Sequence, residues 1–184
     1  NDNNSLYTDK DSNKDYNLSK KQYIIGVSFP TTELVYRAKM KSIAESVYPQ
    51  GNTNKRAQLI IFDGRKSQEK QNEDLLTMIT SGMDGIVLIP WTTDGPLSMI
   101  RYANDIGVPV ITVDNSIDEQ SDCQVISYVG ADHRLMGEQA AELFIEALEN
   151  RYPDEKQWNV IQLTGVPGSS GAIDRGAGIE EVLG

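Results

Sequence analysis

Two repeating patterns of apolar residues divide the chain, from Gln22 onward, into short strands and amphipathic helices. Apolar runs of strand length predict six β-strands, at residues 23–28, 59–62, 86–89, 110–113, 125–130 and 160–163. Between these runs the apolar residues recur at helical spacing, as Met40, Ile43, Ala44 and Val47 do. This spacing predicts helices around residues 40–47, 68–80, 96–107 and 133–150, and a last short helix that ends at Gly184.

The predicted strands are apolar at consecutive positions rather than at every second one. Strands of this kind are buried on both faces, which is typical of a parallel sheet with helices on either side. We therefore expect an α/β fold with a three-layer αβα arrangement. Its first four strand–helix units occupy residues 22–114, and right-handed crossovers connect them.

Residues 1–21 differ from the rest of the chain, because they are rich in Asn, Asp, Ser and Lys and almost devoid of apolar residues. A segment of this composition buries too little apolar surface to fold. We expect a disordered polar tail. A more specific interpretation is a tether that joins a lipid-anchored N-terminus to the folded body on the outer face of a membrane.

Composition and charge exclude several classes of protein. The 184 residues suffice for one domain, or for one domain and part of another. The net charge of −10 argues against nucleic acid and anionic lipid as partners. The single cysteine, Cys123, excludes an intrachain disulfide. No apolar run approaches the roughly 18 residues of a membrane span. Because the chain begins at Asn1 rather than Met and shows no signal peptide, we expect it to have been trimmed.

The loops that follow the strands are the candidate site, because open parallel sheets bind ligands at the carboxyl ends of their strands. These loops contain carboxylates, amides, hydroxyls, an arginine and aromatic rings. Neutral sugars need this mixture, since adjacent hydroxyls pair with a carboxylate or a guanidinium and aromatic rings cover the C–H face. The loops lie at residues 29–36, 63–65, 90–94, 114–116 and 165–175.

Other chemistries are not recognisable in the sequence. The chain has no Gly-Lys-Ser/Thr phosphate loop and no Gly-x-Gly-x-x-Gly after its first strand. His133 is the only histidine, so we expect no histidine-rich metal site and interpret His133 as a surface residue at a helix start. The Gly-rich segment 165–171 either cradles a phosphate or forms a tight turn that brings Arg175 toward a ligand. With no nucleophile–base pair, we expect neither a cofactor nor an enzyme.

Five segments, in order and at matching spacing, resemble the periplasmic sugar-binding proteins of the ribose- and galactose-binding type. They are Ile-Gly-Val-Ser-Phe-Pro (25–30), Met-Asp-Gly-Ile-Val-Leu-Ile-Pro (83–90), Gly-Val-Pro-Val-Ile-Thr-Val-Asp-Asn (107–115), Tyr-Val-Gly-Ala-Asp (128–132) and the Gly/Ser-rich segment at 165–178. The similarity covers residues 22–184. It implies a periplasmic-binding-protein-like type I fold, which is related to the ligand-binding domain of lac-repressor-type regulators.

The resemblance also implies roles for individual residues. Asp114 corresponds to a residue that accepts hydrogen bonds from sugar hydroxyls, and Arg175 to one that donates a bidentate pair. Asn115 is implied as a ligand contact, and Tyr36, or nearby Leu34 and Val35, falls where aromatic rings stack on the sugar. The remaining implied contacts are Thr32 or Glu33 in the first loop and Trp91 in the loop after the third strand.

Each of these residues also has a purely structural interpretation. Asp114 can cap a turn, Trp91 and Tyr36 can be packing residues, and Arg175 can belong to a solvated ion pair. The first loop lacks the Asn-Pro-Phe-Phe usual in the family, so the resemblance does not specify the sugar.

Members of this family have two lobes of similar size, and their chains return to complete the first lobe. The resemblance therefore implies an N-terminal lobe at residues 22–127 without its returning last strand, followed by an incomplete start of the second lobe at 128–184. We expect the edge of the first lobe to be open, or paired with another molecule through self-association.

The function implied by the resemblance is that of an extracytoplasmic solute-binding protein, either periplasmic or lipid-anchored. Its lobes close on a sugar, and the membrane permease of an ABC transporter recognises the closed form. The alternative is a ligand-sensing domain of a signalling or lac-repressor-type regulatory protein. Residues 1–21 show no helix-turn-helix pattern, which favours the transport interpretation.

Overall fold

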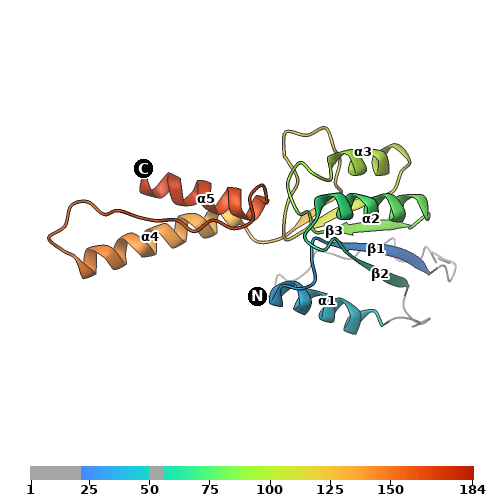
Figure 1. Ribbon diagram of the computed structural model, residues 1–184, viewed down its shortest axis with the longest axis horizontal. Helices are drawn as coiled ribbons and strands as arrows, with labels where there is room; N and C mark the ends of the chain where they lie inside the picture. The colour runs from blue at the N-terminus through green and yellow to red at the C-terminus, as the bar shows by residue number, and fades with distance from the viewer. Residues whose placement is uncertain (1–21, 50–55) are drawn as a thin grey trace, which may run out of the picture.

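The computed structural model describes residues 22–49 and 56–184, and the expected tether at 1–21 lies outside these ranges (Figure 1). Within them, a parallel sheet has the strand order β2-β1-β3-β4-β5. The strands are β1 (Tyr23–Phe29), β2 (Ala57–Asp63), β3 (Gly85–Leu88), β4 (Val110–Val113) and β5 (Tyr128–Val129). The parallel sheet expected from the continuous apolar runs is confirmed.

Helices cover both faces of the sheet, as the three-layer prediction requires. Helix α1 (Val35–Val47) lies on one face, while α2 (Gln68–Thr80) and α3 (Leu97–Asp105) lie on the other (Figure 1). The larger hydrophobic cluster fills the space beneath α2 and α3. It contains Leu75, Met78, Ile79, Met83, Ile86, Leu88, Ile100, Ala103, Val110 and Ile117. Burial of these side chains is the main driving force for the fold.

The face under α1 has a smaller core, formed by Val27, Phe29 and Ile89 with a few half-buried neighbours. Helix α1 forms where the apolar spacing predicts it, but Ile43 and Val47 on its expected inner stripe remain exposed. Among the described helices, α1 is the one that covers this side of the sheet, and part of its apolar surface faces solvent.

The last two helices pack on each other beside the sheet rather than on it (Figure 1). Helix α4 (His133–Arg151) follows β5, and α5 (Ser170–Leu183) runs alongside it. Two glycines allow their backbones to touch, because a Cβ added at Gly137 would collide with the carbonyl oxygen of Arg175, and one at Gly178 with that of Arg134. The close approach fixes where α5 carries its side chains.

Of the predicted strands, one is absent from the structure and another is shorter than expected. Residues 160–163 have no regular structure, and the side chains of Ile161 and Leu163 are 88% and 94% exposed. An apolar run becomes a strand only where a neighbour pairs with its backbone groups, and the described residues supply none here. The fifth strand is limited to Tyr128–Val129, although the N–H of Ile126 still donates to the carbonyl of Val110 at 2.8 Å.

None of the helices in the described ranges has the length and apolar character needed to cross a bilayer.

Candidate functional site

A cavity of about 290 Å³ opens at the carboxyl ends of β1, β3 and β4, where α1, α4 and α5 converge. Strand order reverses at β1, which is where open α/β sheets place their ligands. Five of the seven site residues proposed from the sequence line this cavity, namely Tyr36, Trp91, Asp114, Asn115 and Arg175. The structure thus brings together residues from separate loops in one pocket.

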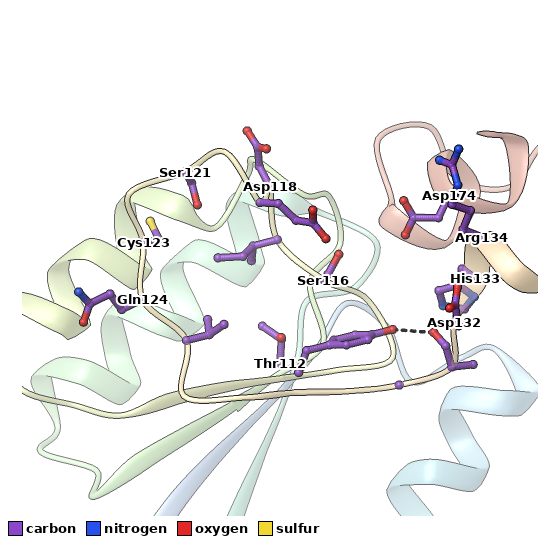
Figure 2. A pocket seen from close by; sticks show the side chains of 16 residues that line it. Thr112, Ser116, Asp118, Ser121, Cys123, Gln124, Asp132, His133, Arg134 and Asp174 are labelled. Atoms are coloured by element: carbon purple, nitrogen blue, oxygen red, sulfur yellow. Dashed lines mark hydrogen bonds between the residues drawn. The ribbon is translucent and has the colours of Figure 1, made fainter. Parts of the chain in front are cut away.

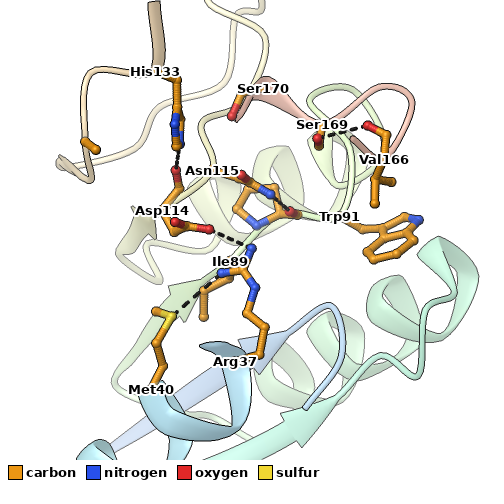
Figure 3. A network of polar contacts seen from close by, with 12 residues as sticks. Arg37, Met40, Ile89, Trp91, Asp114, Asn115, His133, Val166, Ser169 and Ser170 are labelled. Carbon is orange, nitrogen blue, oxygen red and sulfur yellow. Dashed lines mark hydrogen bonds and ion pairs between the residues drawn. The ribbon is translucent and has the colours of Figure 1, made fainter. Parts of the chain in front are cut away.

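An ion pair between Arg37 and Asp114 lies in the cavity wall (Figure 3). The guanidinium Nη2 lies 2.6 Å from Oδ2 of Asp114, and the two side chains are only 10% and 19% exposed. Arg37 also lies 5.7 Å from the ring of Tyr36, within cation–π range. Arg37 was not predicted from the sequence. Its position could have indicated a buried partner, because Arg37 lies three positions before Met40 and therefore on the apolar stripe of its helix.

The backbone of Asp114 has a φ of 64°, a left-handed conformation that aspartate tolerates better than most residues. Three hydrogen bonds hold it there. Its N–H donates to the carbonyl of Val129 at 2.9 Å, and its own carbonyl lies 3.0 Å from both the Tyr128 hydroxyl and the Nε2 of His133. The carboxylate is therefore presented to the cavity from a fixed backbone.

His133 and Arg175 form a second polar contact in the cavity lining. Nη1 of Arg175 lies 2.9 Å from Nδ1 of His133. The expectation that His133 is a surface residue is wrong, because its side chain is buried, with 9% exposure. The helix start that it occupies faces the end of β4, and a hydrogen bond from Leu135 N–H to the Asp132 carboxylate caps that helix start.

Buried amides fix the loops around the cavity. Asn115 donates from Nδ2 to the carbonyl of Pro90 at 2.8 Å. Gln71, fully buried on α2, donates to Ser28 and Ile89 and accepts from the N–H of Trp91 at 3.0 Å. These bonds position Trp91 at the cavity wall, whereas Tyr36 is largely exposed at its rim.

Thr32 and Glu33 do not line the cavity. The Thr32 hydroxyl donates to the carboxylate of Asp63, and Glu33 pairs with Lys66 at 2.6 Å. Burial works to raise the pKa of Asp63, but hydrogen bonds from Thr32 and Arg65 outweigh it, so the pKa lies below its ordinary value. The first loop thus uses these polar side chains to join the ends of β1 and β2.

A second, larger cavity of about 1070 Å³ lies between the loop after β4 and the start of α4 (Figure 2). Asp118 and Glu119 line it from the loop, and Asp132 and Asp174 line it from the helical side. Burial raises the pKa of Asp174, and the charge of Glu119 adds to this effect. Within the described ranges no group of three or more His, Cys, Asp or Glu side chains is arranged to hold a metal ion. The smaller cavity, with its mixed polar and aromatic lining, is the better candidate site.

The fold and this cavity define a class of ligand-binding protein, and comparison with known proteins identifies the family. Residues 25–184 match the family described as periplasmic binding protein domain, and the chain belongs to that family. The ribose import binding protein of Bacillus subtilis strain 168 is 29% identical over 165 residues, which are 89% of this chain and 50% of that protein.

Two further comparisons agree. The galactofuranose-binding protein of Escherichia coli K12 is 29% identical over 160 residues, which are 86% of this chain and 47% of that protein. A crystal structure of a galactofuranose binding protein superposes with a TM-score of 0.75 at 28% identity, covering 88% of this chain and 51% of that one. The chain spans about half the length of the curated relatives it matches, and the resemblance to sugar-binding periplasmic proteins is confirmed.

Proposed function

We propose that this chain supplies one wall, and part of the facing wall, of a monosaccharide-binding cleft in an extracytoplasmic solute-binding protein. The observation that carries the proposal is the convergence of Asp114, Arg175, Asn115, Tyr36 and Trp91 on one cavity from separate strand–helix junctions. To these residues the structure adds Arg37, paired with Asp114.

The cavity groups match the chemistry of a neutral sugar. The Asp114 carboxylate accepts hydrogen bonds from adjacent hydroxyls, and the planar forks of Arg37 and Arg175 donate to ring and hydroxyl oxygens. Trp91 and Tyr36 offer aromatic faces for the apolar side of the ring. Thr32 and Glu33 are left out of the proposed site, because Asp63 and Lys66 already engage their side chains. The same cavity contains no nucleophile paired with a base, so binding rather than catalysis is proposed.

Two relatives support a particular class of ligand and a particular role for this chain. One is a ribose import binding protein and another binds galactofuranose, so we propose import of a monosaccharide through an ABC-type permease. Residues 22–127 form the first lobe and 128–184 begin the second. Rotation between the lobes closes the cleft, and the permease recognises the closed form. The protein works outside the cytoplasm, in a periplasm or anchored by lipid to the cell membrane.

Isothermal titration calorimetry on the complete gene product, with a panel of pentoses, hexoses and furanosides that includes ribose and galactofuranose, tests this proposal. Asp114→Asn keeps the backbone conformation and removes the charge, while Arg175→Lys keeps the charge and removes the fork. Because a hydrogen bond to a charged group contributes about 1.5–3 kcal/mol, each variant is expected to lose about 10-fold to 100-fold in affinity.

Lys41→Ala is the matched control. Lys41 lies one turn after Arg37 on the same helix, but its side chain is 39% exposed, lies outside the cavity lining and forms a long ion pair with Glu45. Its affinity should equal that of the unsubstituted protein. Wild-type affinity in both Asp114→Asn and Arg175→Lys would refute the site.

A further inference from the structure

His133 lies between the two residues on which the proposed sugar site depends most. Its Nδ1 faces Nη1 of Arg175 at 2.9 Å, and its Nε2 faces the carbonyl oxygen of Asp114 at 3.0 Å. Arg175 lies 42 positions away along the chain and Asp114 lies 19 positions away. One ring thus joins the end of β4 to helix α5 (Figure 3 shows the contact with Asp114).

The two partners dictate how the imidazole carries its proton. A guanidinium is a donor only and a carbonyl oxygen is an acceptor only. Nδ1 must therefore be the unprotonated acceptor and Nε2 must carry the hydrogen. The other neutral tautomer and the doubly protonated ring each place a hydrogen on Nδ1, which removes the acceptor that Arg175 uses.

The contact between His133 and Arg175 lies in tightly packed surroundings. A Cβ added at Gly171 would lie 3.3 Å from both Nη1 of Arg175 and Nε2 of His133, closer than most such contacts in proteins. Gly171 also lines the cavity. No carboxylate of the described residues lies within ion-pair distance of Arg175, so His133 is the side chain that orients its guanidinium.

We propose that His133 is a positioning residue of the sugar site, acting through its neutral Nε2–H tautomer. It holds the guanidinium of Arg175 in the orientation that meets the ligand, and it ties that orientation to Asp114 on the other side of the cleft. The inference rests on the proposed function. It extends that function by assigning the orientation of the Arg175 guanidinium to His133, which lies beside it in the cavity lining.

Two substitutions separate positioning from packing. In His133→Asn the amide oxygen is attached to Cγ as Nδ1 is, so it can accept from Arg175. In His133→Leu the volume is kept and the acceptor is lost. We expect sugar affinity within about 3-fold of wild type for His133→Asn and a loss of about 10-fold or more for His133→Leu, from calorimetry on the complete gene product. Adding Arg175→Lys to His133→Leu should cost little more, because both changes remove the same arrangement.

A spectroscopic measurement on the unsubstituted protein needs neither a variant nor a sugar. Long-range ¹H–¹⁵N correlation spectra should show the Nε2–H tautomer of His133 near neutral pH, and Arg175→Lys should shift the Nδ1 resonance. If no sugar of the panel binds, the proposed function fails, and this spectrum alone decides the His133–Arg175 contact. An Nδ1–H tautomer, or equal affinity losses in His133→Asn and His133→Leu, would overturn the inference.

Discussion

At the scale of single residues, Asp114 shows how the site is held in place. A left-handed backbone costs of order 1–3 kcal/mol for most residues and persists only where neighbours enforce it. Here the neighbours are Tyr128 and Val129 of β5 and His133 at the start of α4. The position of the carboxylate thus depends on the segment from β5 to the start of α4 being in place.

Asp63 gives a prediction of pH dependence. Its pKa is lowered in the fold against the opposing effect of burial, chiefly through the hydroxyl of Thr32. A lowered folded-state pKa contributes stability above the unfolded-state value, and this contribution is lost as pH falls through the folded-state value. Thr32→Val should therefore raise the pKa of Asp63 toward its ordinary value, as measured by ¹³C NMR of the carboxyl group.

The same substitution should make the protein less stable near neutral pH, with the difference from wild type shrinking as the pH falls below about 4, the ordinary pKa of an aspartate. Thr77→Val is the control, because the Thr77 hydroxyl bonds only to its own helix, at the carbonyl of Glu73. Its effect on stability should not vary with pH in this range. An unchanged Asp63 titration in Thr32→Val would contradict the assignment.

The rule that parallel sheets bind ligands at the carboxyl ends of their strands was enough to predict which loops form the cavity. The family resemblance then singled out five of the residues that line it, Asp114 and Arg175 among them, but it did not give their partners. Arg37 and His133 could not be predicted in the same way, since each depends on a contact made across the fold. The sequence shows only that Arg37 lies on an apolar stripe and that His133 lies at a helix start. Their roles become clear only when the groups that they contact, Asp114 and Arg175, are known.

At the scale of elements, the contact between α4 and α5 sets the direction of Arg175. In an open helix, Gly→Ala stabilises by about 0.5–1 kcal/mol. At Gly178 the added methyl group would instead collide with the backbone of Arg134, so Gly178→Ala should destabilise the protein by about 1–3 kcal/mol in chemical denaturation.

Gly176 provides the matched control two residues earlier in the same helix. A Cβ there would meet the side chain of Gln162 at an ordinary 3.6 Å. Gly176→Ala should therefore be neutral or stabilising. Destabilisation of the same size in both variants would show that the backbone contact at Gly178 does not govern the effect.

The helices of the fold could be predicted closely from apolar spacing, whereas the strands could be predicted only where a partner was present. Residues 68–80 match α2 at both ends, and 133–150 match α4 to within one residue. Local hydrogen bonds decide a helix, so its own sequence is sufficient. A strand such as 160–163 needs a neighbour, and its sequence does not say whether one exists.

At the scale of the whole molecule, apolar surface remains uncovered at the segment 160–163 and on the α1 side of the sheet. Unpaired apolar segments favour association between copies. We expect the 184-residue chain, prepared alone, to form dimers or larger species whose mass rises with concentration in light scattering. Ile161→Lys combined with Leu163→Lys should reduce that mass.

Gln162→Lys adds one positive charge, half of what the double variant adds, to the same segment without removing apolar surface, so it should reduce association much less than the double variant does. Solution scattering from a monomeric, fully ordered particle at all concentrations would count against this expectation.

The hydrogen bonds from Tyr128 and His133 to the carbonyl of Asp114 bear on how the helical pair α4–α5 moves relative to the sheet. These hydrogen bonds lie beside the cavity, so in the proposed rotation of the helical pair relative to the sheet the pivot would lie close to them. Helix α4 has 19 residues and, at 1.5 Å per residue, acts as a lever arm of about 28 Å, so a swing of about 10° would carry its far end about 5 Å. The groups around the pivot would move by far less. In the proposed closure, a small adjustment near the cavity would therefore accompany a large displacement at the far end of α4.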